Sequence, residues 1–206
     1  TVLIVPSCKL FTSEELFCYQ TQTIGGVMIT AKDIMFSIMM SMSDYNIHDV
    51  AIHPEQLYCM SINVYHEARG ESLAGKSAVA HVTLNRVKSD FYPNNICDVV
   101  KQAKLRASWR YPSQMIPVRN QCQFSWYCDG RSDAIELYLD GHEIRDNMAA
   151  WNQSVQASML AIMGLTIDPT DGSTHYFNHN LVNPDWSQIF KKKAVLGNHS
   201  FYQRTK

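Results

Sequence analysis

Residues 62–89, INVYHEARGESLAGKSAVAHVTLNRVKS, contain two apolar helical patterns separated by a short break. The first pattern begins at Pro54, a residue that suits the first turn of a helix. Two glycines bracket the break, and the apolar pattern then resumes. The sequence therefore predicts two helices, with Glu67 near the end of the first helix and Glu71 in or just after the turn.

The composition of the chain is that of a folded protein with a sizeable core. The chain has 206 residues, of which 46% are hydrophobic, and its formal net charge is -1. This length indicates one domain, and the apolar content excludes general disorder. Because there is no basic excess, we expect no nucleic-acid partner. No apolar run reaches the ~18 residues that a membrane span requires, so we expect no membrane insertion.

Further elements follow from the same patterns. We predict helices over 30–47 and 149–165, a loop or short hairpin over 116–133, an extended segment over 168–186, and a short strand near the C-terminus. Residues 96–112 indicate a helix that becomes irregular. We expect residues 1–50 to form an N-terminal segment packed on the core, and residues 51–206 to form the catalytic domain.

Six cysteines permit disulfides, although a chain of this length does not need them. Cys122 and Cys128 flank QFSWY and could bridge a loop, or both could be reduced. The apolar and aromatic neighbours of Cys97, Cys122 and Cys128 favour buried or bridged cysteines over a catalytic thiolate.

Two histidine patterns could indicate zinc, and both are incomplete. A metalloprotease helix needs a second histidine four residues after His66, and that position is Gly70. His175 and His179 have the required spacing, but they lie between turn signals and no third ligand is evident. We therefore predict no metal and no cofactor.

Glu67 has surroundings that suit an acid catalyst. Cleavage of a glycosidic bond requires a carboxylic acid that protonates the leaving oxygen. An apolar wall helps such a group to keep its proton near neutral pH, and Val64, Tyr65 and Ala68 could supply that wall. Arg69 would act in the opposite direction if its side chain approached. A solvent-exposed glutamate paired with a nearby cation is the alternative.

Six motifs in a fixed order resemble a known family. EARGE with GKSAVAHVTLNRVKS, then FYPNNICDVV, QCQFSWYCDG, DPTDGSTHYFN, NPDW and LGNHSFY resemble the SleB/CwlJ-type cell-wall hydrolases, which include spore-cortex-lytic enzymes and phage lysins. The resemblance covers residues 56–202. It implies an α+β, mainly helical, lysozyme-like or transglycosylase-like domain with a small β element.

The resemblance also implies the activity and its catalyst. Such enzymes cleave peptidoglycan strands between N-acetylmuramic acid and N-acetylglucosamine. In members that are lytic transglycosylases, the first glutamate of EARGE is the acid and base, and this role carries over to Glu67. Around it we predict the following substrate-binding residues: Glu71, Thr83, Gln123, Phe124, Ser125, Trp126, Tyr176 and Phe177. Asn85 and Arg86 are expected to brace the site together with Thr83.

Three alternatives stay open at this point. A muramidase would need a second carboxylate, for which Glu71, Asp129 and Asp185 are candidates. A zinc amidase acting on the stem peptide and a non-catalytic wall-binding or virion module are the other two. We expect a monomer that acts on the bacterial wall. The N-terminus lacks the pattern of a signal peptide, which would fit a phage endolysin that waits in the host cytoplasm until a holin releases it.

Overall fold

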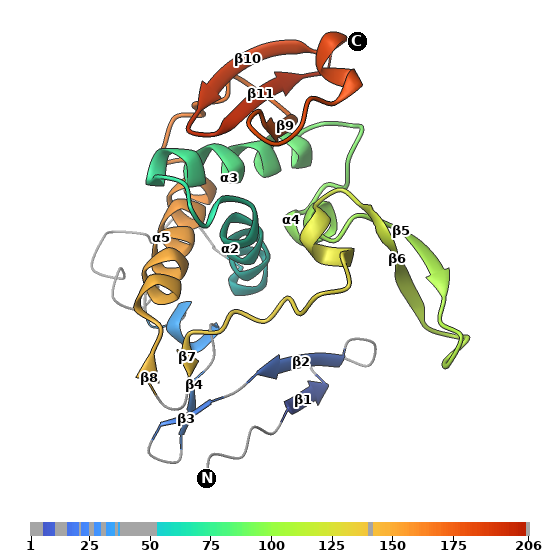
Figure 1. Ribbon diagram of the computed structural model, residues 1–206, viewed down its shortest axis with the longest axis vertical. Helices are drawn as coiled ribbons and strands as arrows, with labels where there is room; N and C mark the ends of the chain where they lie inside the picture. Colours follow the sequence, from blue (N-terminus) through green and yellow to red (C-terminus); the bar gives the residue numbers. More distant parts are fainter. Residues whose placement is uncertain are drawn as a thin grey trace.

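In the computed structural model, the described residues are 6–10, 16–20, 22–24, 27–29, 32–35, 37, 53–139 and 142–204. The N-terminal part contains two strand pairs, which are β1 (Pro6–Leu10) with β2 (Leu16–Gln20) and β3 (Gln22–Ile24) with β4 (Val27–Ile29). These strands lie apart from the helices in Figure 1. Of the helix predicted over 30–47, residues 32–35 and 37 are helical, and the rest lies outside the described residues.

Four helices build the core of the remaining chain. They are α2 (Pro54–Ala68), α3 (Leu73–Val87), α4 (Ile96–Val100) and α5 (Arg145–Ile162). Helix α2 lies at the centre and contacts the other three (Figure 1). The predicted helix pair on either side of the EARGE turn is confirmed. The turn is short because Ser72 caps α3 by accepting a hydrogen bond from the backbone N–H of Gly75 at 3.3 Å.

Helix α3 is the middle layer of the domain. On one side, Val79 and Ala80 pack in a core cluster with Met60 and Val64 of α2. On another side, Ala78 and Val82 pack under Phe201 of the C-terminal sheet. Because α3 is covered on two sides, its apolar residues are not confined to one stripe.

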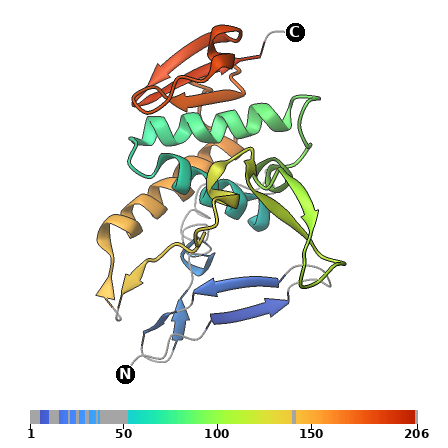
Figure 2. The ribbon, with the colours of Figure 1, turned by 45° about the vertical axis from the view of Figure 1, so that its right-hand side comes forward.

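The C-terminal sheet covers α3. It has the antiparallel order β10–β11–β9, formed by β9 (His175–Asn178), β10 (Lys191–Leu196) and β11 (His199–Gln203). A short helical turn, η2 (Asp185–Gln188), precedes β10. Figures 1 and 2 show this sheet lying along α3 on the side away from α2. Together with the helical core, it confirms the predicted α+β class with a small β element.

A long hairpin departs from the sequence-based prediction. Strand β5 (Ala103–Ala107) pairs with β6 (Met115–Cys122), where an irregular segment was expected for the first of the two. A turn of 3-10 helix, η1 (Ser125–Cys128), follows it, and the pair β7 (Tyr138–Leu139) and β8 (His142–Glu143) leads into α5. The predicted C-terminal strand likewise proves to be two paired strands, β10 and β11.

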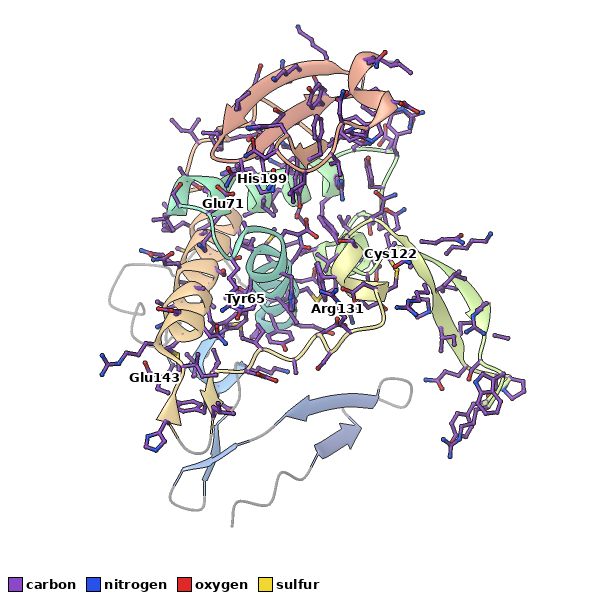
Figure 3. The ribbon with its side chains drawn as sticks, viewed as in Figure 1. Tyr65, Glu71, Cys122, Arg131, Glu143 and His199 are labelled. Carbon is purple, nitrogen blue, oxygen red and sulfur yellow. A yellow bond between two sulfur atoms is a disulfide. The ribbon has the colours of Figure 1, made fainter. Side chains whose placement is uncertain are left out.

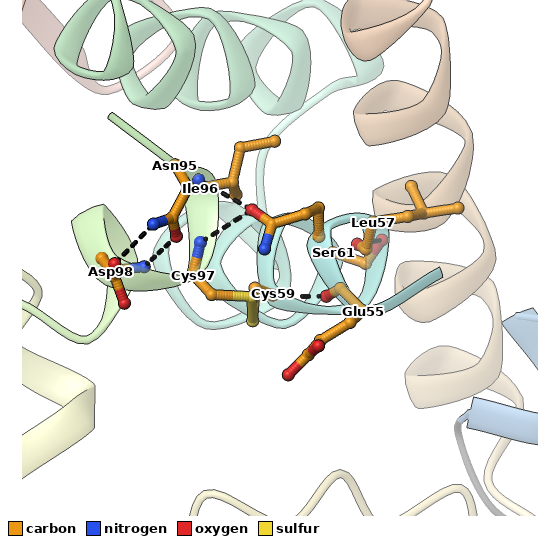
Figure 4. The surroundings of a disulfide bond; sticks show 9 residues. Glu55, Leu57, Cys59, Ser61, Asn95, Ile96, Cys97 and Asp98 are labelled. Atoms are coloured by element: carbon orange, nitrogen blue, oxygen red, sulfur yellow. Dashed lines mark hydrogen bonds between the residues drawn. A yellow bond between two sulfur atoms is a disulfide. The ribbon is translucent and has the colours of Figure 1, made fainter. Parts of the chain in front are cut away.

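Two disulfide bonds cross-link the described residues of the domain. Cys59 of α2 is bonded to Cys97 of α4, as Figure 4 shows, and Cys122 is bonded to Cys128 around η1. The second bond is the one that the sequence offered as a possibility. Helix α4 is fixed further because Gln56 Oε1 accepts hydrogen bonds from the backbone N–H groups of Ile96 at 2.8 Å and Cys97 at 3.2 Å.

The N-terminal segment contributes two described residues to the core. Met35 is fully buried in a cluster with Leu57 and Tyr65 of α2 and Trp151 of α5, and the half-buried Ile34 packs against the same cluster. The packing of residues 1–50 as a whole on the core and the boundary near residue 50 stay predictions.

Candidate active site

Glu67 lies in the last turn of α2, and the backbone that follows it is held rigidly. The ammonium group of Lys76 donates hydrogen bonds to the backbone carbonyls of Arg69 at 3.1 Å and Glu71 at 2.5 Å. Lys76 is buried, and burial lowers its pKa while the nearby Glu71 carboxylate raises it. A buried cation that binds the carbonyls at a helix C-terminus satisfies groups that have no partner within the helix. The position of Glu67 is therefore set by α2 and by this capping lysine.

The Glu67 carboxyl is partly buried and receives a hydrogen bond from the C-terminal sheet. The hydroxyl of Tyr176 on β9 donates to Glu67 Oε2 at 2.8 Å. Burial raises the pKa of Glu67, against the smaller opposing effects of this hydrogen bond and of the Arg86 cation. Burial also raises the pKa of Tyr176 well above its ordinary value, so the phenol keeps its proton and acts as the donor. Burial thus favours the protonated carboxyl, while the hydrogen bond from Tyr176 and the Arg86 cation favour the carboxylate.

Arg86 links α3 to the strand that carries Tyr176. Its Nε donates to the backbone carbonyl of Thr174 at 2.8 Å. Its guanidinium lies over the rings of Phe124, 4.7 Å from the centroid, and Tyr92, 5.4 Å from the centroid. Arg86 is buried and its Nη1 has no hydrogen-bond partner among the described residues. The bracing role expected for Arg86 is thus visible as a fixed connection behind Tyr176.

Trp126 of η1 contacts the face of α2 that carries Glu67. Its indole N–H donates to Asn63 Oδ1 at 2.9 Å, and Asn63 Nδ2 donates to Thr83 Oγ1 at 3.2 Å. Residues four apart on a helix share a face, so Asn63 places the indole one turn from Glu67. His66 stacks on the same indole, with ring centroids 4.7 Å apart. Tyr176 and Trp126 therefore reach this face of α2 from two different segments of the chain.

Three further predicted site residues have positions that suit contact with a substrate. Gln123 and Ser125 are exposed and lie on the segment that carries Trp126, which is itself half-buried. Their roles stay predictions.

The structure corrects three predicted substrate contacts. Thr83 is 0% exposed and Phe124 is 2% exposed, so neither side chain can touch a glycan strand; both pack behind the site. Successive side chains of a strand point to opposite faces. Phe177 consequently points away from the sheet face of Tyr176 and packs against Tyr202 and Trp186.

Glu71 has a structural position that conflicts with its predicted contact with substrate. Its side chain is only 10% exposed, and its Oε1 accepts a hydrogen bond from Asn198 Nδ2 at 2.8 Å. His199 Nδ1 lies 3.8 Å from the same oxygen, and burial lowers the pKa of this imidazole. Figure 3 shows Glu71 and His199 together at the junction between α3 and the C-terminal sheet. Glu71 joins the EARGE turn to the turn between β10 and β11.

Several residues of the site were not identified from the sequence. Asn63 and Lys76 are polar residues inside apolar helical patterns, and such residues need buried partners. That signal could have marked both.

Asn85, which was expected to brace the site, donates to Asp168 Oδ2 at 2.8 Å and to the carbonyl of Ser173 at 3.0 Å. It thereby holds the loop that leads into β9.

The described residues include no cluster of three or more histidine, cysteine, aspartate or glutamate side chains that could hold a metal ion. His175 packs among Tyr92, Trp186 and Phe190, and His179 contacts the hydroxyl of Ser200. Within the same ranges, no helix is long and apolar enough to span a membrane.

Comparison with known proteins gives a consistent family. The model of the cell wall hydrolase family matches residues 70–202, a range that begins just after Glu67. Among curated proteins, the spore cortex-lytic enzyme of Bacillus cereus is 28% identical over 142 residues, which are 69% of this chain and 42% of that protein. The spore cortex-lytic enzyme of Bacillus subtilis is 26% identical over 138 residues, covering 67% of this chain and 34% of that protein. The chain thus spans less than half the length of these curated relatives.

The matches to solved structures cover a larger share of both chains than the matches to the curated proteins. The catalytic domain of the Bacillus cereus SleB protein matches with a TM-score of 0.51 and 25% identity, over 74% of this chain and 93% of that structure. The catalytic domain of the germination-specific lytic transglycosylase SleB from Bacillus anthracis matches with a TM-score of 0.51 and 26% identity, over 74% of this chain and 98% of that structure.

Proposed function

Because this chain belongs to the cell wall hydrolase family, we propose that it cleaves the glycan strands of peptidoglycan as a lytic transglycosylase. The likeness to a solved lytic transglycosylase domain, nearly all of which this chain covers, supports the reaction type. The single observation that carries the proposal is the partly buried Glu67 carboxyl, which accepts a hydrogen bond from Tyr176. One carboxyl that changes its protonation state within the reaction is what this chemistry needs.

In the first step, the protonated Glu67 donates its proton to the oxygen that bridges N-acetylmuramic acid and N-acetylglucosamine. The bond from that oxygen to C1 of the muramoyl residue breaks, and positive charge develops at C1. The raised pKa of Glu67 supports this step, because a larger fraction of the carboxyl carries the proton at a given pH. The N-acetylglucosamine residue leaves with the donated proton on its hydroxyl.

In the second step, the Glu67 carboxylate takes the proton from the C6 hydroxyl of the same muramoyl residue. The C6 oxygen forms a bond to C1 and closes a 1,6-anhydro ring, so no water is consumed and Glu67 regains its proton. Tyr176 and Arg86 support this step, since the donated hydrogen bond and the cation both favour the carboxylate. Burial favours the protonated form of Glu67 that acts as the acid, and its two polar neighbours favour the carboxylate that acts as the base.

The candidates for a second carboxylate favour this reaction over a muramidase. Glu71 is largely buried and bonded to Asn198. Asp129 accepts a hydrogen bond from the backbone N–H of Arg131 at 2.8 Å, and Asp185 is exposed in η2, beyond the outer face of the sheet. A retaining or inverting hydrolase would need a second carboxylate about 5–9.5 Å from Glu67, across the sugar. Glu71 is held by Asn198 instead, and Asp185 lies in η2.

The finer points of function stay proposals. We place the chain at the bacterial wall, and the Cys59–Cys97 and Cys122–Cys128 disulfides support action in an oxidising environment. Its use as a monomeric phage endolysin that a holin releases stays a prediction.

Mass spectrometry of the fragments released from purified peptidoglycan tests the proposal. We expect muropeptides with 1,6-anhydro ends from the wild-type protein, and no detectable release by Glu67→Gln, which keeps the shape of the side chain. Glu143→Gln is the matched control, because Glu143 is exposed on β8, far from the site (Figure 3). Reducing ends would assign the reaction to hydrolysis, and full activity of Glu67→Gln would refute the role of this residue.

A further inference from the structure

The β5–β6 hairpin projects from the domain and exposes large aromatic side chains. Figures 1 and 2 show it extending away from the helices. Trp109 is 84% exposed and Tyr111 is 56% exposed at its turn. This turn is ordered, because the backbone N–H of Ser108 donates to the carbonyl of Gln114 at 2.8 Å and that of Gln114 donates to the carbonyl of Tyr111 at 2.8 Å. An ordered turn that keeps a tryptophan ring in water indicates a contact surface.

The hairpin has one apolar face and one cationic face. Leu105 lies opposite Pro117 and Ala107 opposite Met115, while Arg106 lies opposite Ile116. Because side chains alternate along a strand, the first two pairs share one face and Arg106 lies on the other. Both Leu105 and Met115 are exposed, so the apolar face is uncovered.

The hairpin carries a strong local positive charge. Residues 103–122 contain four cations and no acidic residue, although the whole chain has a net charge of -1. The cations are Lys104, Arg106, Arg110 and Arg119. Within the described part of the chain, no carboxylate lies within ion-pair distance of these four side chains. The Arg110 guanidinium lies over the Tyr111 ring, 5.6 Å from its centroid. Arg119 Nε donates to the backbone carbonyl of Asp129 at 3.1 Å, which leaves Lys104, Arg106 and Arg110 for an anionic partner outside this chain.

The base of the hairpin is fixed to the candidate active site. The backbone N–H of Gln123 donates to the carbonyl of Gln102 at 2.9 Å, and the Cys122–Cys128 disulfide ties the end of β6 to η1. The same short segment contains Trp126, whose indole is bonded to Asn63 on α2. Strand β6 has 8 residues, so it extends about 26 Å from this point.

We propose that this hairpin binds the stem peptides of peptidoglycan through their carboxylates, at positions along the polymer beyond the bond that is cleaved. This inference rests on the proposed function, and the link between the base of the hairpin and the segment that carries Trp126 supports it. Stem peptides carry free carboxylates, which the unpaired arginines and lysine can bind. The flat faces of Trp109 and Tyr111 lie against the sugar rings or the apolar parts of the same peptides. The hairpin thereby retains the protein on the wall between cleavage events.

Sedimentation with insoluble peptidoglycan tests the proposal, using Glu67→Gln as the background so that the wall is not degraded. We compare this protein with one that also carries Arg106→Glu and Arg110→Glu, and with one that carries Trp109→Ala and Tyr111→Ala. The matched control carries Lys191→Glu and Lys192→Glu, which make the same charge change on exposed residues of β10. The thermal unfolding midpoint of each variant checks that the fold is retained.

We expect the hairpin charge variant to bind about tenfold more weakly, with a smaller dependence on salt, while the β10 variant binds like the parent protein. We also expect the aromatic variant to bind more weakly. Converting the wall carboxylates to methylamides should abolish the difference between the charge variant and its parent, and stripping phosphate polymers from the wall should preserve it.

Other outcomes overturn the proposal. Equal binding by the hairpin variants and their parent would exclude the hairpin. A difference that survives amidation and disappears with the phosphate polymers would assign the hairpin to those polymers. Hairpin-dependent binding to anionic lipid vesicles, or hairpin-dependent self-association, would assign it to those partners instead. If the wild-type protein releases no muropeptides while hairpin-dependent wall binding persists, the proposed reaction fails and the hairpin assignment stands.

Discussion

The Cys59–Cys97 disulfide should contribute more stability than any other single covalent constraint in the described domain. It joins α2 to α4 and closes a stretch of chain that contains Glu67 and all of α3. A disulfide stabilises the native state mainly by restricting the unfolded chain, and the effect grows with the length of the closed loop. For a sequence separation of 38, the loop-entropy relation gives about 4 kcal/mol at room temperature. For Cys122–Cys128, with a separation of 6, it gives about 2 kcal/mol.

Urea unfolding followed by tryptophan fluorescence measures this difference. The variant with Cys59→Ala and Cys97→Ala should lose about twice the free energy of unfolding that the variant with Cys122→Ala and Cys128→Ala loses. The single change Cys59→Ala should cost within about 1 kcal/mol of its double variant, because it already removes the cross-link.

The comparison of the two bonds decides whether the reasoning is sound. An equal or larger loss on removing the Cys122–Cys128 bond would refute the loop-entropy account. So would a Cys59 and Cys97 double variant as stable as the wild-type protein. The prediction bears on function, since the longer loop holds the catalytic candidate and its capping lysine.

Three further predictions concern the candidate site and its support. Glu67→Gln should raise the thermal unfolding midpoint at pH 8 and leave it unchanged at pH 4. The folded-state pKa of Glu67 is raised, so the stability that this group contributes is complete below its unfolded pKa and is lost as the pH rises through its folded pKa. Equal midpoints of the variant and the wild-type protein at both pH values would contradict this. Tyr176→Phe should lower the rate of wall lysis about ten- to a hundredfold. It should also move the alkaline limb of the pH–rate profile to higher pH, because the hydrogen bond that is lost lowers the pKa of Glu67. An alkaline limb at the same pH would refute this coupling between Tyr176 and Glu67. Gly197→Ala should lower the free energy of unfolding by about 1–3 kcal/mol, since φ is +54° and the new Cβ would lie 2.0 Å from Glu71 Oε2. Gly70→Ala, which meets nothing within 4 Å, is its matched control in urea unfolding.

Local patterns were sufficient to predict α2, α3 and α5. Their apolar periodicity, Pro54 at the start of α2 and the glycine-bracketed break define them without reference to the rest of the chain. The same patterns placed Glu67 at a helix end. They failed for β5, although residues 103–107 alternate between apolar and charged side chains. A run of five residues that follows directly on the helical pattern of α4 is too short to be told from an irregular helix end.

The sequence by itself determined that Glu67, the predicted acid, lies at the end of a helix, because helix ends are encoded by near neighbours. Only the tertiary structure decided which groups surround that residue. Tyr176 is 109 positions away from Glu67, and the register of β9 on β11 turns Tyr176 toward the helices and Phe177 away from them. Packing likewise placed Glu71 against Asn198 and buried Thr83 beneath Asn63. These contacts depend on how α3 and the C-terminal sheet stack, and no local pattern specifies that stacking.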